Sequence, residues 1–256
     1  MSGSSELPAP VAPVAPVAPV APVALVTGAT SGIGREVARK LAADGFSVLV
    51  HGRDAARGAA VVDEIIADGG HARFAEADLT DAADIERLAA EAADVDVLVN
   101  NAGFSWFGPT AELTPATFDA MFAANVRSAY FLVAAIAPTM AKRGAGAIIN
   151  LGSMAGQIGL AGGAAYSATK AALASLTRSW AAEFSPQGVR VNTVAPGPAY
   201  TDGAAPERTA ALGDTTLLGR AAEAGEIADV IAFLASPKAA YITGAVIAAD
   251  GGRTAI

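Results

Sequence analysis

The hydrophobic positions from Val23 onward fall into short apolar runs that alternate with longer Ala-rich segments. The short runs are rich in Val, Leu and Ile and are apolar at nearly every position, which predicts strands buried on both faces. These predicted strands are 24–27, 47–51, 72–76, 97–100, 147–151, 189–194 and 245–248.

The segments between these strands repeat apolar residues with the period of a helix. They predict helices over 34–43, 55–68, 82–92, 114–141, 165–184 and 226–234. This alternation indicates an α/β fold: a single-domain, doubly wound, mostly or fully parallel seven-stranded sheet with helices on both faces. Ligands of such sheets bind beyond the carboxyl ends of the strands, so functional residues are expected directly after strand ends.

The N-terminal stretch departs from this pattern because it repeats a Pro-Val-Ala triplet from Pro10 to Ala24. Proline fixes φ and removes backbone donors, so neither a helix nor a central strand is expected. We expect 1–22 to be a disordered leader with polyproline II character and 23–256 to form the domain. A docking peptide for a proline-recognising partner, as in a scaffold protein, is the alternative. The stretch lacks the basic start of a secretory signal.

Composition narrows the class of protein. The 256 residues are 53% hydrophobic and 16% charged, which suits one α/β domain. The net charge of −8 argues against nucleic acid or an anionic membrane as a partner. The absence of Cys rules out disulfides, a thiolate nucleophile and Cys-ligated metal, and the two His are far apart, so no metal site is expected. No apolar run of spanning length lacks Gly, Pro or charge, and a cytoplasmic protein is expected.

The first predicted strand runs directly into the glycine-rich segment "TGATSGIG". Glycines there permit a tight turn and a close approach of the backbone to a phosphate at the helix N-terminus. The spacing T-G-x-x-x-G-x-G differs from the usual dinucleotide fingerprint, and a glycine-rich turn without a ligand is the alternative. The candidate cofactor contacts are Gly28, Thr30, Ser31, Gly32, Ile33 and Gly34.

The end of the second strand, "SVLVHGRD", bears on the choice of cofactor. Gly52 stands where an acid would favour NAD, and Arg53 follows it. A guanidinium pairs well with a 2′-phosphate, so NADP(H) is favoured, with NAD(H) as the open alternative. Arg53 as a solvated surface charge is the other interpretation. Asp54 falls later, where it can cap the next helix.

The segment "YSATK" places Tyr166 and Lys170 four residues apart, on one face of a predicted helix. A free phenol has a pKa of about 10, which makes it a poor proton shuttle at neutral pH. A nearby positive charge favours the phenolate and lowers that pKa. Such a pair is common on helix surfaces, so its meaning depends on the other motifs.

Three further motifs follow predicted strand ends: "LVNNAG", "NLGSMAG" and "NTVAPGPAYT". In this order and spacing, all five motifs resemble the short-chain dehydrogenase/reductase family over 23–256, which implies a Rossmann fold. The segment "FLASPKAAYITGAVIAADGG" resembles the branch that holds the 3-oxoacyl thioester reductases.

The resemblance implies four catalytic roles. Ser153 would hydrogen-bond the substrate carbonyl, and Tyr166 would pass a proton to that oxygen as hydride arrives. Lys170 would bind the nicotinamide ribose and lower the pKa of the tyrosine. Asn125, in "FAANVRSAYF", would kink its helix and hold a water in the proton relay. Plain helix or turn chemistry is the alternative for Asn125 and Ser153.

The resemblance also implies further contacts with the cofactor. Asp78 would bond the adenine amino group, with Leu79 beside it, and 101–103 would line the adenosine ribose. Residues of 196–201 would hold the nicotinamide carboxamide. The implied set is Asp78, Leu79, Asn101, Ala102, Gly103, Tyr166, Lys170, Pro196, Gly197, Ala199 and Thr201.

An apolar substrate pocket is expected from the bulky side chains near these motifs, which are Phe104, Trp106, Phe107, Leu160 and Tyr200. The weakly periodic stretch 200–220 is typical of a mobile lid. No dense Arg/Lys cluster marks a docking face for an acyl carrier. Relatives form tetramers through the helices that correspond to 114–141 and 165–184, so a homotetramer is expected.

The expected function is an NADP(H)-dependent oxidoreductase that transfers hydride between nicotinamide and a carbonyl or secondary alcohol of a small molecule. A 3-oxoacyl thioester or related ketone is the favoured substrate. An NAD-dependent dehydrogenase of a sugar, polyol or steroid-like alcohol is the first alternative. A non-catalytic dinucleotide-sensing protein is the second, and the intact set of Ser153, Tyr166 and Lys170 argues against it.

Overall fold

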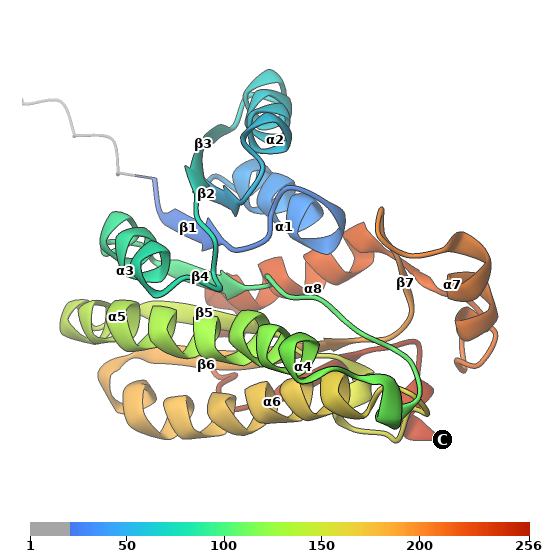
Figure 1. The fold of residues 1–256 in the computed structure, drawn as a ribbon. Coiled ribbons are helices and arrows are strands. Elements are labelled where there is room, and N and C mark those ends of the chain that lie inside the picture. Colours follow the sequence, from blue (N-terminus) through green and yellow to red (C-terminus); the bar gives the residue numbers. More distant parts are fainter. Residues whose placement is uncertain (1–20) are drawn as a thin grey trace, which may run out of the picture.

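A seven-stranded, fully parallel sheet forms the centre of the computed structural model (Figure 1), which confirms the predicted fold class. The structure describes residues 21–256, so the predicted leader up to residue 20 lies outside the described residues. In spatial order the strands are β3 (His71–Glu76), β2 (Ser47–Gly52), β1 (Val23–Val26), β4 (Val97–Asn100), β5 (Gly146–Leu151), β6 (Val189–Pro196) and β9 (Val246–Ala249).

The strand order reverses beside β1. From β1 the chain moves outward to β2 and β3, and it then returns to place β4 on the opposite side of β1. Val26 is in register with both Val50 and Val99, so these strands end at one edge of the sheet. The loops after β1, β2, β4 and β5 therefore open at the same switch point, where ligands of such sheets bind.

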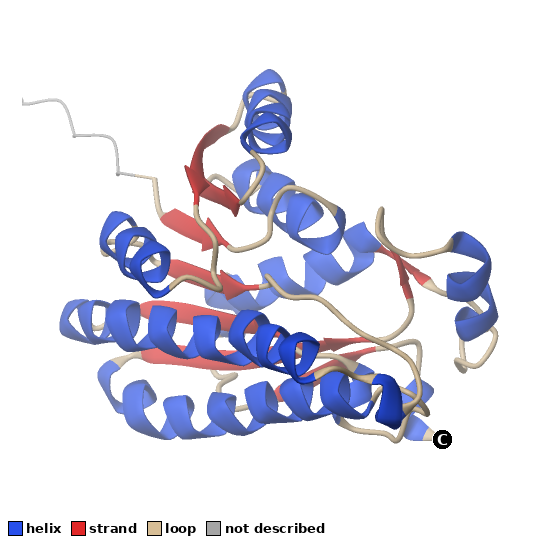
Figure 2. Cartoon of the chain, in the orientation of Figure 1, coloured by secondary structure: helices blue, strands red, loops and turns tan. Residues whose placement is uncertain are grey.

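Helices cover both faces of the sheet, as Figure 2 shows. One face carries α1 (Gly32–Ala43), α2 (Ala55–Ala67) and α8 (Ala224–Ala235). The other carries α3 (Ala82–Glu91), α5 (Ser128–Arg143) and α6 (Ala164–Phe184), with α4 (Pro115–Phe122) leading into α5. The short 3-10 turns are η1 (Thr110–Glu112), η3 (Met154–Gly156), η4 (Ser185–Gln187), η5 (Pro237–Ala239) and η6 (Arg253–Ala255).

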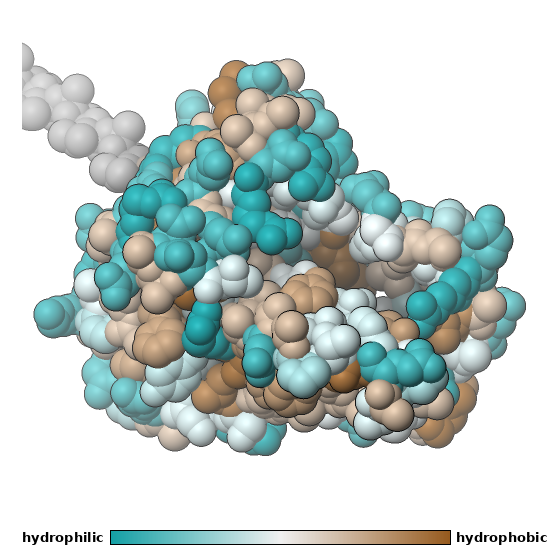
Figure 3. Space-filling view, viewed as in Figure 1, coloured by the Kyte–Doolittle hydropathy of each residue, from teal (hydrophilic) through white to brown (hydrophobic). Residues whose placement is uncertain are grey.

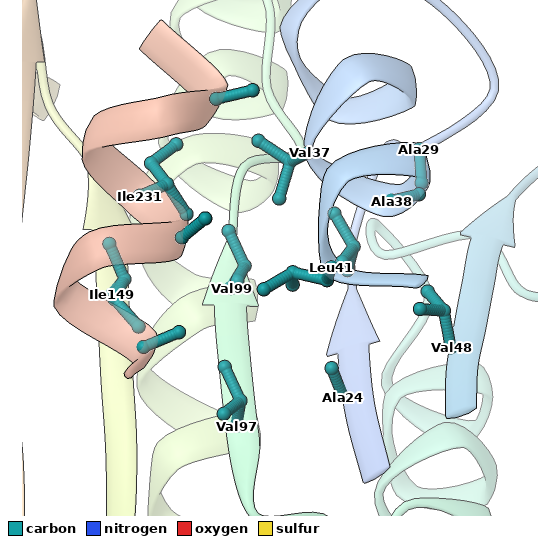
Figure 4. Packing of buried hydrophobic residues seen from close by; sticks show 14 of the residues in the cluster. Ala24, Ala29, Val37, Ala38, Leu41, Val48, Val97, Val99, Ile149 and Ile231 are labelled. Carbon is teal, nitrogen blue, oxygen red and sulfur yellow. The ribbon is translucent and has the colours of Figure 1, made fainter. Parts of the chain in front are cut away.

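The hydrophobic core lies in two layers, one on each face of the sheet. Val97 and Val99 face α1 and α8, where Leu41 and Ile231 pack over them (Figure 4). The intervening Leu98 points to the opposite layer, beneath α5. Successive side chains of a strand point to opposite faces, so a strand covered on both sides is apolar at every position. This explains the continuous apolar runs of the sequence.

The long helix predicted over 114–141 is continuous but changes its winding. Five residues between α4 and α5 are π-helical, namely η2 (Ala123–Arg127). Within residues 21–256, the stretch Pro115–Arg143 is long and apolar enough to cross a bilayer by length and composition. Its residues Leu132 and Ile136 are fully buried against the sheet. A core helix of a globular protein passes the same test of length and composition.

Three elements near the C-terminus are absent from the sequence prediction. The two-residue strands β7 (Ala199–Tyr200) and β8 (Ala222–Glu223) pair with each other, apart from the main sheet. Between them, α7 (Pro206–Gly213) stands out from the body of the molecule (Figure 1, orange). This region was predicted only as a lid, because such short elements leave no periodic pattern.

Candidate active site

The glycine-rich loop joins β1 to the N-terminus of α1. Gly28 and Gly32 have φ values of 64° and 53°, which L side chains rarely adopt. A Cβ at Gly34 would lie 2.3 Å from the carbonyl oxygen of Gly28, so the turn needs glycine there as well. The N–H of Gly32 donates to a carboxylate oxygen of Asp202 at 3.2 Å. The start of α1 thus already receives an anionic oxygen, as a phosphate-binding helix terminus does.

A cleft of about 400 Å³ lies against this loop at the carboxyl edge of the sheet. Figure 3 shows the hollow on this face, between the part that carries α1 and the part that carries α4. Twelve of the predicted cofactor contacts line it: Gly28, Thr30, Ser31, Ile33, Gly34, Arg53, Asp78, Leu79, Asn101, Ala102, Gly103 and Thr201. The predicted contacts outside its lining are Gly32, Tyr166, Lys170, Pro196, Gly197 and Ala199.

At the end of the cleft beside β2, the side chain of Thr30 lies against Gly52. A Cβ at Gly52 would come within 2.4 Å of the Thr30 methyl carbon, so an acidic side chain does not fit unless Thr30 moves. Arg53 is exposed and forms no ion pair with any described residue. Arg57 pairs instead with Asp54 at 3.1 Å, and Asp54 caps α2 as the sequence indicated. This end of the cleft therefore offers an exposed guanidinium without an ion-pair partner and no carboxylate at position 52, although Arg53 is near enough to Asp78 to help lower the pKa of that carboxyl.

His51 supports the glycine-rich loop from below and was not predicted as a site residue. Its side chain is 3% exposed, and its Nδ1 accepts the backbone N–H of Gly28 at 3.1 Å. Its Nε2 lies 3.1 Å from the carbonyl oxygen of Ala77, which places the proton on Nε2. Burial lowers the pKa of His51 to about 4, so the ring is neutral at pH 7. A polar residue inside an otherwise apolar strand was the available signal.

Asn101 joins the ends of β4 and β1. Its side-chain Nδ2 donates to the carbonyl oxygens of Thr27 and Gly28 at 2.8 and 3.0 Å. Asp78, after β3, accepts from the N–H and hydroxyl of Thr80 at 2.9 and 2.8 Å, which lowers the pKa of Asp78. Both side chains thus fix the shape of the cleft wall through local hydrogen bonds.

The predicted catalytic side chains meet at the end of β5. Ser153 caps η3, where its Oγ accepts the N–H of Ala155 at 3.1 Å, and its hydroxyl lies near enough to Tyr166 to act on the pKa of the phenol. Lys170 lies one turn after Tyr166 in α6, is 5% exposed, and donates from Nζ to the carbonyl oxygen of Leu151 at 2.7 Å. The Lys170 Nζ is 5.6 Å from the centroid of the Tyr166 ring. Ser153, Tyr166 and Lys170 therefore form one cluster.

The pKa of Tyr166 is raised, whereas the neighbouring lysine was expected to lower it. Burial raises the pKa of Tyr166, and the nearby Ser153 hydroxyl offsets only part of that rise. The lysine ammonium is 5.6 Å from the ring and bonded to a carbonyl, so desolvation dominates. Burial also lowers the pKa of Lys170 to about 8, which keeps most of this side chain protonated at pH 7. The phenol is thus a protonated donor beside a cation.

Asn125, which was predicted to kink its helix, lies in the π-helical segment η2, through which the helix continues. The side chain is 2% exposed, and it exchanges two hydrogen bonds with the backbone of Phe104 at 3.0 and 2.9 Å. Its Nδ2 also donates to Thr169 Oγ1 at 3.1 Å, and that hydroxyl donates to the carbonyl of Tyr166. Asn125 therefore ties the loop after β4 to the helix of the tyrosine, while the relay water stays a prediction.

The predicted pocket side chains do not all gather at one place. The Phe107 ring lies 5.6 Å from the Tyr166 ring. Phe104 lines the cleft of the glycine-rich loop, whereas Trp106 lies in a separate apolar cavity of about 560 Å³ with Phe118. Leu160 accepts a turn hydrogen bond from Gly163, and Tyr200 lies in β7. The aromatic neighbour of Tyr166, the predicted proton donor, is thus Phe107.

A buried chain of polar side chains behind the cluster was also missed. Asn100 donates to Asn150 at 2.9 Å, Asn150 donates to Thr177 at 2.8 Å, and Thr177 lies 2.7 Å from Thr193. This chain joins β4, β5, α6 and β6 directly beneath the site. Polar residues within the apolar strands "VLVN" and "AIIN" were its only sequence signal.

Comparison with known proteins places this geometry in a family. The short chain dehydrogenase family matches residues 22–211. Galactitol 2-dehydrogenase (L-tagatose-forming) of Cereibacter sphaeroides is 41% identical, over 90% of this chain and 93% of that protein. Cis-4-hydroxycyclohexanecarboxylate dehydrogenase of Sinomonas cyclohexanicum is 40% identical, over 91% and 96%. The 3-oxoacyl-(acyl-carrier-protein) reductase of Staphylococcus aureus is 37% identical, over 89% and 96%.

Solved structures agree with the sequence relatives. A short chain dehydrogenase/reductase family protein superposes with a TM-score of 0.85 at 49% identity, over 92% of this chain and 98% of that one. An angucycline C-6 ketoreductase with bound NADP has a TM-score of 0.86 at 35% identity, over 92% and 96%. This chain is therefore a member of the short-chain dehydrogenase/reductase family and an oxidoreductase of alcohols and ketones.

Proposed function

We propose that the protein is an NADP(H)-dependent oxidoreductase that interconverts a ketone and a secondary alcohol. The observation that carries the proposal is the cluster of Ser153, Tyr166 and Lys170 at the end of β5, next to the cleft of the glycine-rich loop. Bound nicotinamide would accept or supply the hydride. Three features fit a dinucleotide. The cleft lies at the carboxyl edge of the parallel sheet, the N-terminus of α1 already receives a carboxylate oxygen, and the glycine-rich turn precedes that helix.

The side chains supply the proton chemistry. The Ser153 hydroxyl would hold the substrate oxygen, and the Tyr166 phenol would donate its proton to that oxygen during reduction. The raised pKa of Tyr166 keeps this proton in place at neutral pH. Lys170 would hold a positive charge close to the phenolate that remains after transfer. The reverse direction uses the same groups with the proton moving back.

The preference for NADP(H) is supported by the end of the cleft beside β2. Thr30 fills the space that an acid at position 52 would need, and Arg53 lacks a carboxylate partner among the described residues. A 2′-phosphate would give Arg53 an ion-pair partner. NADP is also bound in the solved ketoreductase that the chain resembles.

Two substrate classes are supported. The sequence favours a 3-oxoacyl thioester, and the relative from Staphylococcus aureus is named for that activity. The second candidate is a polyol or cyclic secondary alcohol, which is favoured by the names of the relatives at 41% and 40% identity. We retain both as targets of one assay.

Steady-state kinetics test the proposal. NADPH and NADH oxidation are measured in parallel with acetoacetyl thioester and with a cyclic ketone, using the full chain and a Tyr166→Phe variant. Turnover that prefers NADPH and falls by about 10²–10⁴ in the variant supports the proposal. A preference for NADH would contradict the role of Arg53. Binding of both cofactors without turnover of any substrate would favour the dinucleotide-sensing alternative.

We also propose a cytoplasmic homotetramer that assembles through α4, α5 and α6. Phe118, Tyr130 and Phe131 expose 42, 45 and 52% of their surface along α4 and α5, which supports burial against another subunit. Sedimentation velocity tests this, and a monomer at micromolar concentration would contradict it.

Deleting 1–22 is expected to leave activity unchanged if those residues are the disordered leader.

A further inference from the structure

Arg208 of α7 lies over the aromatic ring that borders the proton donor. Its guanidinium carbon is 4.8 Å from the centroid of Phe107, within the range of a cation–π contact. The Phe107 ring is in turn 5.6 Å from the Tyr166 ring. A cation from the lid segment is thus placed two ring contacts from the phenol. Gly163 permits this arrangement, because a Cβ there would come within 2.9 Å of Phe107.

The charge of Arg208 is not compensated by any carboxylate in the described part of the chain. The next arginine along, Arg220, is held by both oxygens of Glu226 at 2.7 Å. Glu207 precedes Arg208 directly, and consecutive helix positions do not face each other. Arg208 is exposed and its side chain forms no hydrogen bond or ion pair with any described residue, so its N–H groups are available for a planar anion while the guanidinium rests on Phe107.

We propose that Arg208 binds the carboxylate of a compact keto acid or hydroxy acid whose reacting carbon lies at Ser153 and Tyr166. The apolar body of the substrate would pack on Phe107. An acyl thioester carries its phosphates at the far end of a long arm, whereas this cation is one aromatic ring, Phe107, away from Tyr166. The inference rests on the proposed function, because it assigns the substrate of that same site.

Binding of a non-reacting acid tests the role of Arg208 without turnover. Cyclohexanecarboxylate and its uncharged carboxamide are titrated calorimetrically into the full chain with saturating NADP⁺. The variants are Arg208→Gln and Arg208→Lys. Lys142→Gln is the matched control, since it removes one exposed positive charge at the far end of α5.

The wild-type protein is expected to bind the acid about tenfold more tightly than the carboxamide, as a charge-assisted pair at a partly exposed site requires. Arg208→Gln should abolish this preference, Arg208→Lys should retain part of it, and Lys142→Gln should keep it. Equal binding of acid and carboxamide by the wild type, no binding of the acid, or a preference that survives in Arg208→Gln would overturn the assignment.

Kinetics separate this inference from the proposed function. The ketone substrates are 4-oxocyclohexanecarboxylate and its carboxamide, and NADPH oxidation is measured with each. If both ketones are reduced at the same rate and this rate depends on Tyr166, the result would overturn the role of Arg208 and support the proposed function. Acid binding that depends on Arg208, without turnover of either ketone, would support the anion site and count against the proposed function.

Discussion

Acidification is expected to destabilise the folded protein through His51, the buried residue beneath the glycine-rich loop. In the folded state its Nδ1 accepts from Gly28, so a second proton would break that hydrogen bond and place a charge in a buried site. Burial lowers the pKa of His51 from its ordinary value near 6.5 to about 4. In the unfolded chain the side chain titrates normally.

The size of the effect follows from this difference in pKa. Between pH 6.5 and pH 4 the unfolded chain binds a proton that the folded chain does not, so the free energy of unfolding falls as the pH falls. At 1.36 kcal/mol for each pKa unit, the loss is about 3 kcal/mol when the pH reaches 4. Above pH 6.5 the residue adds no pH dependence.

Urea unfolding at several pH values between 7.5 and about 4 measures this loss, with His51→Gln as the reference. Glutamine can accept from Gly28 and donate to Ala77, yet it does not titrate. Carboxylates contribute equally to both proteins, so the difference between their stabilities isolates the histidine. That difference should move by about 3 kcal/mol in favour of the variant as the pH falls. Parallel stability curves would refute the reasoning.

Three other perturbations follow from the site. Gly52→Asp should raise the KM for NADPH at least about tenfold, because its Cβ collides with Thr30. Adding Thr30→Ala should improve the use of NADH, and an unchanged ratio of kcat/KM for NADPH to kcat/KM for NADH would contradict this. The rate of ketone reduction should fall as the pH rises through about 8, where Lys170 loses its charge, and a profile flat to pH 9.5 would argue against that role. Asn125→Ala should lower the free energy of unfolding by about 3 kcal/mol, since it removes the three hydrogen bonds that this buried amide makes with Phe104 and Thr169, at about 1 kcal/mol each; a loss in urea below about 0.5 kcal/mol would contradict this.

The cluster around Tyr166 shows what was predictable about the site. Tyr166 and Lys170 share a helix face through their spacing, and Ser153 follows a strand that ends at the same edge. Parallel strands bring their carboxyl ends together, so strand order was enough to expect these residues near one another. The sequence could not show which of Trp106 and Phe107 lies beside Tyr166, because neighbouring loop residues can point to different cavities.

The sequence by itself determined the alternation of buried strands and helices, the parallel sheet, and the motifs that follow strand ends. These features depend on local periodicity and on the few topologies that such an alternation permits. Only the tertiary structure decided that His51 holds Gly28, that Arg208 lies over Phe107, and that burial raises the pKa of Tyr166. Each of these depends on distances and solvent exposure between segments far apart in the chain, which no local pattern encodes.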